Sequence, residues 1–536
     1  WRHPPGVPMI GPMTDPSSSL PEADPHEFLS PGASGSRGTS PDIGTPTSRI
    51  VALVVVTLLY LVIAGAQNLS GYLAPAENQL GRDPRGGEFA KLMFLIEEAL
   101  GGGKAGGQLA EASLTQFEAS SHPADRLQGV LVLGESKDPA RALRLLETIR
   151  SNLGPAANTE AGEGSLGSGG SPRRTDWALV RAPDDPETGA KPDEEFVVDQ
   201  EVIHDAEAME TLYTLGLDAL SDDARERLVE RYGWLGRLAT TPETDTQARD
   251  ELYADIPWAI AFLVFAGGMF LVWGVAGLTM FIVAIVMMAT GRLPFRFERP
   301  RVGGSVFLET LGVFLLGFGL VQVGGALVGK SNPQIAGVVG MLGQWLLILT
   351  LFWPLLRGVK VVEWCGAVGW TAPRGVFREI VAGIAGYFAG VPLFVAGAVM
   401  TVVLTFLSAK IFGEPTEPPS NPILEIVRSA DLLMLVLLIS LATIWAPIVE
   451  ETLFRGALYR HLRGRVGFFV AALSTALLFA YLHSYGPLMV GPLIALGFTF
   501  AMIREWRGSL IGSITAHCLH NSAIMVLMLL AMKAMA

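Results

Sequence analysis

A double glutamate followed by an arginine stands out in the last third of the chain, within IVEETLFRGALYRHL at residues 448–462. Arg455 lies four residues after Glu451, so in a helix these two side chains share a face and can form an ion pair. Glu450 points about 100° away from Glu451 and stays free for chemistry. The alternative is ordinary charge at the end of a membrane helix, with arginines extended toward the lipid headgroups.

Two further groups of chemically active side chains follow in the sequence. FAYLH brings Phe479 and His483 onto one helix face, and HCLHN does the same for His517 and Asn521. Imidazole and amide groups in an apolar helix are costly unless they find partners in the bundle. Each group alone has a plain structural alternative, which is interfacial or interhelical hydrogen bonding. Three such groups in one membrane region favour a functional site.

Together, the three groups resemble the motifs of the CPBP family of intramembrane proteases, which includes the type II CAAX prenyl endopeptidases and the bacterial Abi proteins. The family pattern is EExxxR, then FxxxH, then HxxxN or HxxxB. The chain has EETLFR at 450–455, FAYLH at 479–483 and HCLHN at 517–521. The resemblance covers roughly residues 430–531 and implies an intramembrane endopeptidase, of the glutamate type or the metallo type.

The resemblance also implies that four of these residues act on the substrate. Glu450 is expected to activate the attacking water, and His483 to help hold and polarise it. His517 and Asn521 are expected to donate hydrogen bonds to the oxyanion of the tetrahedral intermediate, which their N–H groups can do. The predicted catalytic residues are therefore Glu450, His483, His517 and Asn521.

The remaining motif positions are predicted to support the site. The resemblance implies that Glu451 and Arg455 orient the helix that carries Glu450, and that Phe479 packs against its neighbours. His520 lies within HCLHN but is not a family position, so we expect a structural role for it.

The involvement of a metal is the open question about this chemistry. One glutamate and two histidines can complete a catalytic zinc site with three protein ligands, which would be Glu450, His483 and His517. The sequence has no HExxH motif, and members of the family are also interpreted as metal-free glutamate proteases. We expect no cofactor, with zinc as the alternative.

Long apolar segments must position these side chains. Of the 536 residues, 50% are hydrophobic, and the mean hydropathy is +0.41. A helix needs about 20 apolar residues to cross the hydrocarbon core of a bilayer. The sequence therefore predicts an all-α polytopic membrane protein, a multi-helix transmembrane bundle with an inserted α-helical extramembrane domain. The nine expected crossings are 50–66, 257–290, 304–326, 334–356, 376–409, 430–449, 467–483, 487–503 and 509–531.

Composition divides the chain into regions of different character. Pro, Ser and Gly dominate the start, and a second Gly/Ser-rich stretch interrupts the polar region that follows the first crossing. Such stretches are typical of disordered tails and flexible linkers. The expected regions are a disordered tail (1–48), a first transmembrane helix (49–67), an acidic soluble α-helical domain (68–255) with a flexible linker (154–175), further transmembrane helices (256–428) and a CPBP-like catalytic core (429–536).

Charge predicts the orientation of the chain. Residues 67–255 contain 35 acidic and 18 basic residues, although the whole chain carries a net charge of -12. When the amino-terminal tail is placed inside, the basic clusters between the membrane segments all fall on the inner side. This favours a multi-pass protein of a cell membrane, the prokaryotic cytoplasmic membrane, with residues 68–255 outside. The clusters are Arg292/Arg296/Arg299/Arg301, Arg357/Lys360/Arg374/Arg378, Arg455/Arg460/Arg463/Arg465 and Arg504/Arg507.

The expected partners are a membrane-embedded or lipidated protein substrate and the lipid bilayer, without nucleic acid. The acidic domain is a candidate surface for a protein partner. Two other functions stay open: a non-catalytic membrane scaffold or bacteriocin-immunity-type binding protein, and a proton-coupled transporter, because buried carboxylates and histidines also mark proton relays. The two halves show no inverted repeat with matching broken helices, which disfavours the transporter.

Overall fold

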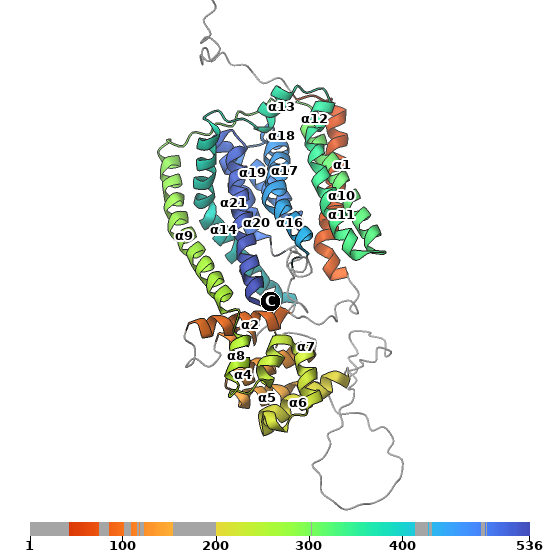
Figure 1. The fold of residues 1–536 in the computed structure, drawn as a ribbon. Helices are drawn as coiled ribbons and strands as arrows, with labels where there is room; N and C mark the ends of the chain where they lie inside the picture. Colours follow the sequence, from red (N-terminus) through yellow and green to blue (C-terminus); the bar gives the residue numbers. More distant parts are fainter. Residues whose placement is uncertain are drawn as a thin grey trace, which may run out of the picture. The chain divides into compact units, whose positions relative to one another are not determined.

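The computed structural model of this chain consists of helices, and no strand occurs in the residues that it describes. The described residues run from 42 to 535. They do not include 74–84, 101–108, 115, 116, 118–122, 154–199, 302, 413–426, 428–430, 484–487 and 489. Among the described residues, seven segments are long and apolar enough to cross a membrane (Figure 1). They confirm an all-α polytopic membrane protein, and they are Pro46–Gln67, Thr246–Ala289, Val306–Gly329, Ile335–Leu356, Val376–Ser408, Leu432–Arg463 and Ile511–Met535.

The bundle contains both long helices and short helical turns. The helices that carry the candidate site residues come last in the chain and pack against α10 and α14, which precede them. The elements are α1 (Pro46–Leu73), α9 (Ile256–Ala289), α10 (Val306–Gly329), α11 (Pro333–Leu346), η5 (Leu347–Phe352), α12 (Trp353–Leu356), α13 (Val361–Val368), α14 (Val376–Phe412), α16 (Leu432–Ser440), η6 (Leu441–Trp445), α17 (Ala446–Glu451), η7 (Thr452–Leu458), α18 (Tyr459–Arg463), α19 (Phe468–Tyr481), α20 (Gly491–Arg507) and α21 (Ile511–Met535).

The expectation of nine full crossings is wrong at 467–483 and 487–503. These segments form α19 and α20, of 14 and 17 residues. At 1.5 Å per residue they are about 21 and 26 Å long, less than the ~30 Å hydrocarbon core. Glu505, near the end of α20, accepts hydrogen bonds from Tyr459 and Arg463 of α18, just before α19 begins. The two helices therefore form a hairpin that starts and ends near the end of α18.

One continuous helix of 32 residues, Leu432–Arg463, carries the double glutamate. Asp431 caps its first turn, because its side chain accepts a hydrogen bond from the backbone N–H of Met434 at 2.8 Å. The helix widens into π-helical turns at η6 and η7, which lie immediately before and after α17. Such turns change which carbonyls and side chains face a neighbouring helix, and they occur frequently at functional sites.

Glycines allow α14 to approach the last two helices closely. A Cβ atom added to Gly383 would lie 2.3 Å from the carbonyl oxygen of Gly512 in α21, and one added to Gly390 would lie 2.3 Å from a methyl carbon of Thr499 in α20. Small residues permit this backbone approach between membrane helices. α14 thus packs directly against α20 and α21, which carry part of the candidate site.

The predicted disordered tail ends earlier than residue 48. Gly304 donates a backbone hydrogen bond to the carbonyl of Asp42 at 2.7 Å, and the Asp42 carboxylate pairs with Arg460 at 2.9 Å. The next residue, Ile43, accepts a hydrogen bond from the N–H of Ser305. These contacts supply acceptors for N–H groups at the start of α10, which have none within the helix. Residues 1–41 lie outside the described residues.

Residues between α1 and α9 form a second group of packed helices, of which α2 also packs against α9 and α21 of the bundle. α4 ends at Glu135 and α5 begins at Pro139, and Ser221 caps α7 by accepting from the N–H of Ala224. The predicted linker 154–175 lies outside the described residues. The elements are α2 (Arg85–Ala99), η3 (Ala110–Ser113), α4 (Pro123–Glu135), α5 (Pro139–Leu153), α6 (Gln200–Leu215), η4 (Leu217–Ala219), α7 (Asp222–Thr240) and α8 (Thr246–Leu252).

Candidate active site

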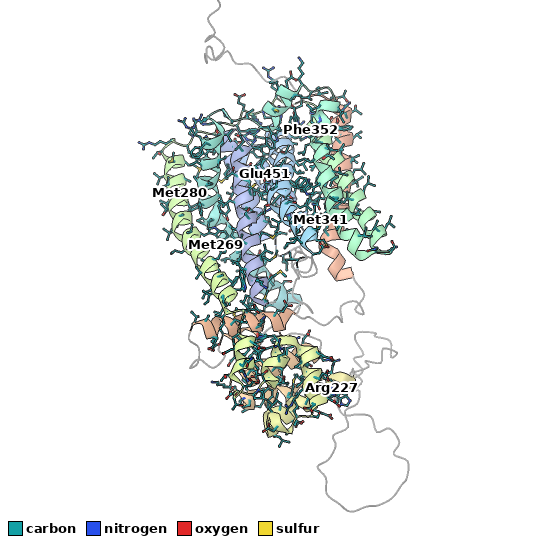
Figure 2. All side chains as sticks on the ribbon, in the orientation of Figure 1. Arg227, Met269, Met280, Met341, Phe352 and Glu451 are labelled. Atoms are coloured by element: carbon teal, nitrogen blue, oxygen red, sulfur yellow. The ribbon has the colours of Figure 1, made fainter. Side chains whose placement is uncertain are left out.

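The second residue of the double glutamate, Glu451, is fixed inside the bundle (Figure 2). Its Oε1 atom lies 2.8 Å from Nη1 of Arg455, and both side chains have 0% exposure. The i,i+4 ion pair predicted from the sequence is therefore confirmed. A buried pair is stable only when its remaining donors and acceptors are also satisfied, so the surroundings of Arg455 matter.

Arg455 is held by two aromatic rings and one carbonyl. Its Nη2 donates to the carbonyl of Gly497 in α20 at 3.0 Å. The guanidinium carbon lies 4.5 Å from the ring centre of Phe479 and 5.2 Å from that of Phe500. Cation–π contacts of this kind stabilise a desolvated arginine. Phe479 thus packs against the ion pair, and it does so from the carboxyl end of α19.

His517 on α21 reaches both glutamates. Its Nδ1 lies 3.2 Å from Oε1 of Glu451, and its Nε2 lies 3.9 Å from Oε2 of Glu450. A carboxylate that is paired with an arginine can only accept, so Nδ1 carries the proton and Nε2 faces Glu450. The imidazole ring stacks on Phe500, with ring centres 5.0 Å apart, which fixes its plane.

Glu450 differs from Glu451 in both exposure and partners. Its side chain keeps 19% exposure, and its Oε2 atom is buried without a hydrogen-bond partner among the described residues. The 3.9 Å separation from His517 is longer than a hydrogen bond. Of the two carboxylates, Glu450 is therefore the one that is free to take a proton from another molecule.

His483 follows the end of α19. Its Nδ1 donates to the carbonyl of Phe479 at 2.9 Å, because a carbonyl only accepts, and in the neutral ring this leaves Nε2 as an acceptor. Drawn as a full crossing, segment 467–483 puts His483 at the opposite end of the bundle from Glu450. Because α19 has only 14 residues, Phe479 instead contacts Arg455 and His517, and His483 lies one turn beyond it.

Asn521 links α21 to the helix of the double glutamate. Its Nδ2 donates to the carbonyl of Ala442 at 2.8 Å, within the π-helical turn η6. One N–H of the amide is used in this bond, and the amide has a second N–H. The bond fixes Asn521 at a turn whose backbone pairing departs from that of an α-helix.

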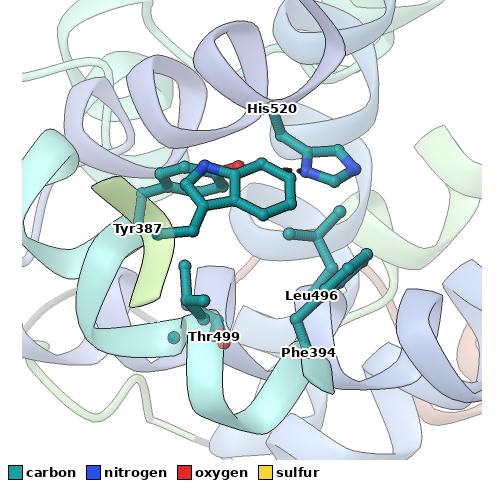
Figure 3. A pocket seen from close by; sticks show the side chains of 8 residues that line it. Tyr387, Phe394, Leu496, Thr499 and His520 are labelled. Carbon is teal, nitrogen blue, oxygen red and sulfur yellow. Dashed lines mark hydrogen bonds between the residues drawn. The ribbon is translucent and has the colours of Figure 1, made fainter. Parts of the chain in front are cut away.

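His520 faces a small pocket beside the site (Figure 3). Its Nδ1 lies 3.3 Å from the hydroxyl of Tyr387, and its ring stacks on Trp273. This agrees with the structural role expected from the sequence, since these partners come from α14 and α9 and not from the glutamate helix. The pocket is lined by Trp273, Tyr387, Gly390, Val391, Phe394, Leu496, Thr499 and His520.

The zinc alternative does not fit the geometry. In the described part of the chain, no three His, Cys, Asp or Glu side chains gather closely enough to hold a metal ion. The Nδ1 atoms of His483 and His517 are used in bonds to a carbonyl and to Glu451, so only their Nε2 atoms could face a metal ion, and these do not converge with Glu450. Glu450, His483 and His517 therefore do not form a ligand set for a metal here.

Two residues of the site carry no signal in the sequence. Phe500 is fully buried between the Arg455 guanidinium and the His517 ring, and Gly497 supplies the carbonyl that Arg455 binds. Both lie in α20, between the second and third motifs. A phenylalanine and a glycine in an apolar helix are ordinary in composition, and only the packing of α20 against η7 and α21 identifies them.

Comparison with known proteins finds a family similarity over the segment that contains these residues. Residues 432–523 match the family model described as "Rce1-like: Type II CAAX prenyl endopeptidase Rce1-like". No curated protein and no solved structure matches the chain. The matched segment contains all three motifs and the residues around Glu450, which confirms the resemblance predicted from them. Over residues 432–523 the chain is thus similar to the Rce1-like type II CAAX prenyl endopeptidases.

Proposed function

We propose that this protein is an intramembrane endopeptidase that hydrolyses peptide bonds with a water activated by Glu450. The observation that carries the proposal is the difference between the two adjacent carboxylates. Glu451 is engaged through Oε1 by Arg455 and His517 and has 0% exposure, whereas the side chain of Glu450 keeps 19% exposure and lies 3.9 Å from His517. A base must be within reach of the proton that it removes and must not be committed to another charge.

In the first step, Glu450 takes a proton from water while the water oxygen bonds to the carbonyl carbon of the scissile peptide. The π electrons of that carbonyl move onto its oxygen. His483 accepts the second water hydrogen on Nε2, which orients the water, since its Nδ1 already donates to Phe479. A positioned base of this kind contributes about 10²–10⁴-fold to the rate.

The oxyanion that forms accepts hydrogen bonds from His517 and Asn521. His517 donates through Nε2–H in its doubly protonated form, and Asn521 through the N–H that does not bind Ala442. When the oxyanion collapses, the C–N bond breaks and the proton held by Glu450 passes to the leaving amine. Donors that are fixed before the reaction stabilise this charge without reorganisation.

Glu451, Arg455 and Phe479 act as positioning residues in this proposal. Glu451 and Arg455 fix the helix next to Glu450 and orient His517 through its Nδ1. Phe479 covers the guanidinium of Arg455.

The proposed substrate is a membrane-embedded or lipidated protein. The proposed location is the cytoplasmic membrane of a prokaryote, with the acidic helical domain (68–255) outside as a surface for a protein partner. This domain contains more acidic than basic residues, whereas the rest of the chain contains more basic than acidic ones, and the difference supports this placement.

The test compares terminal peptides in membrane proteomes of cells that express the wild-type chain, Glu450→Gln or Glu298→Gln. Glu298 is an exposed carboxylate in the loop after α9, so it controls for the loss of one charge. We expect new termini with the wild type and with Glu298→Gln, and none with Glu450→Gln at equal expression. Cleavage should survive exhaustive chelation. New termini that persist with Glu450→Gln would contradict the proposal. Their absence in all three strains would favour the alternative function, a non-catalytic membrane scaffold or binding protein.

A further inference from the structure

Three exposed arginines gather at the end of the bundle where α9 ends and α14 begins. Arg296 lies in the loop after α9, Arg374 in the loop before α14, and Arg378 in the first turn of α14. Arg296 is far in the sequence from Arg374 and Arg378, so only the fold brings the three together.

The carboxyl end of α20 joins the two loops. The N–H of Arg296 donates to the carbonyl of Glu505 at 2.9 Å. Two residues later in α20, Arg507 forms a two-pronged pair with Glu379, at 2.8 and 2.9 Å. Glu379 directly follows Arg378. Arg374 lies within electrostatic range of Arg296, Arg378 and Arg507.

The two buried carboxylates nearby already have partners, although Glu379 still attracts Arg374, and the exposed Glu298 of the same loop forms no ion pair with the described residues. Glu379 is buried and accepts both hydrogen bonds from Arg507. Glu505 is also buried, and it accepts from Arg463 and Tyr459. Neither is left to neutralise the exposed arginines, and Arg296, Arg374 and Arg378 form no ion pair with any residue that the structure describes. Like charges held together in this way repel unless an anion is bound between them.

Apolar side chains border the arginines. Phe295 precedes Arg296 and is 49% exposed, and Phe377 precedes Arg378 and is 77% exposed. Val376, at the start of α14, is exposed as well. Phenylalanines beside basic residues are typical of surfaces whose apolar side chains enter the boundary between lipid headgroups and acyl chains. The surface thus offers three guanidinium groups to an anion and apolar side chains to the chains attached to it.

We propose that Arg296, Arg374 and Arg378 form a binding site for the phosphate group of an anionic phospholipid. Guanidinium groups bind phosphate through paired N–H donors, which makes arginine better suited than lysine to this ligand. The exposed Phe295 and Phe377 select a phosphate that carries lipid chains over a soluble one. The site is independent of the peptidase chemistry, because none of its residues lies in the candidate active site.

The test titrates the full-length protein in neutral detergent with phosphatidylglycerol and counts bound lipids by native mass spectrometry. The variant replaces all three arginines by glutamine (Arg296→Gln, Arg374→Gln and Arg378→Gln). The matched control removes three other positive charges, exposed and located in the loop after α9 and just before α13 (Arg299→Gln, Arg301→Gln and Lys360→Gln). At about 1 kcal/mol for each basic residue near an anionic lipid, the affinity of the triple variant should fall at least about tenfold. The control should change less than about twofold.

Two further arms distinguish the sources of the phosphate and protect the result from misfolding. Inorganic phosphate and glycerol 3-phosphate should not displace phosphatidylglycerol, and full displacement by either would overturn the lipid assignment. Equal losses of affinity in the variant and the control would also overturn it, as they would show general attraction to charge. If the triple variant does not fold, Arg374→Gln alone should give a smaller loss of affinity, and no loss there overturns the proposal.

Discussion

Asp205 in the extramembrane domain and Glu451 in the membrane bundle are both buried carboxylates beside an arginine. Asp205, in α6, accepts from the hydroxyl of Tyr232 at 2.9 Å and from Nη1 of Arg231 at 3.2 Å. Glu451 lies 2.8 Å from Arg455 and 3.2 Å from His517. In both regions, one oxygen of a buried acid accepts from an arginine and from one further donor, as buried charges require partners.

The difference lies in what stands beside each pair. Glu451 has a second carboxylate next to it in the chain, and Glu450 keeps a partly exposed side chain and an unpartnered buried oxygen among the described residues. Asp205 stands between His204 and Ala206, so the domain has no such neighbour at this position. A buried ion pair by itself therefore indicates structure, and the base that we propose is the neighbouring acid that the pair leaves uncommitted. The predictions below test this distinction.

Arg455→Leu should have the largest effect. It leaves Glu451 charged and buried without its cation, and breaking a buried pair in this way costs about 3–5 kcal/mol. We expect most of the variant to be lost on solubilisation, and the remainder to unfold at a lower temperature. Size-exclusion chromatography and thermal unfolding of the full-length protein measure both effects.

A double variant isolates the charge from the packing. Adding Glu451→Gln to Arg455→Leu removes the uncompensated acid, because the amide that replaces it carries no charge into the apolar site. The double variant should thus be more stable than Arg455→Leu alone. If the single substitution leaves the unfolding temperature unchanged, the pair does not contribute as proposed.

The sequence allows most helices and the motif residues to be predicted because both depend on local patterns. Apolar runs identified seven spans, and the i,i+4 spacing of Glu451 and Arg455 predicted their ion pair. The bounds of α19 were predicted to within two residues, and the error was to treat so short a helix as a full crossing. A full crossing would have placed His483 at the opposite end of the bundle from Glu450.

Contacts that depend on tertiary packing were also out of reach. The stacking of Phe500 on His517 joins α20 to α21, and the bond from Asn521 to Ala442 requires the π-helical turn η6. Neither a phenylalanine in an apolar helix nor a change from i+4 to i+5 hydrogen bonding leaves a periodic signal in the sequence.

Asp205→Asn should have a smaller and local effect. The amide oxygen of asparagine can keep the bond from Tyr232, but the charge opposite Arg231 is lost, at a cost of about 1–3 kcal/mol. Hydrogen exchange of the full-length protein should become faster in α6 and α7 and stay the same around Glu450. Faster exchange in α17 or α21 would contradict the separation of the two regions.

Phe500→Leu should reduce catalysis more than stability. Aromatic stacking is worth about 0.5–1.5 kcal/mol beyond burial, so a loss of orientation at His517 should lower kcat about two- to tenfold with a smaller change in KM. The assay uses a substrate identified from the terminal peptides. Phe270→Leu, at an exposed position on α9, is the control and should leave kcat unchanged. A rise in KM alone would point to substrate binding instead of the positioning of His517.

Glu135→Gln should have the smallest effect, and it should appear only as a pH dependence of the extramembrane domain. Burial raises the pKa of Glu135 from its ordinary 4.5 to about 7, while Arg249 and the hydroxyl of Tyr213 oppose the shift and Glu243 adds to it. The folded domain therefore binds this proton more tightly than the unfolded chain does. The stability that the proton contributes is complete below pH 4.5 and is lost as the pH rises through about 7.

Because glutamine cannot lose a proton, the variant should lack this part of the pH dependence. Hydrogen exchange in α4 of the wild type, corrected for the intrinsic rate, should become severalfold faster between about pH 5.5 and 8, with solvent screening of the partly exposed side chain limiting the size of the effect. The same comparison in Glu135→Gln should be nearly flat. The peptides around Glu450 should behave alike in both proteins, since Glu135 and Glu450 lie in regions whose buried charges make separate sets of contacts. An equal pH dependence of α4 in both proteins would assign it to another group.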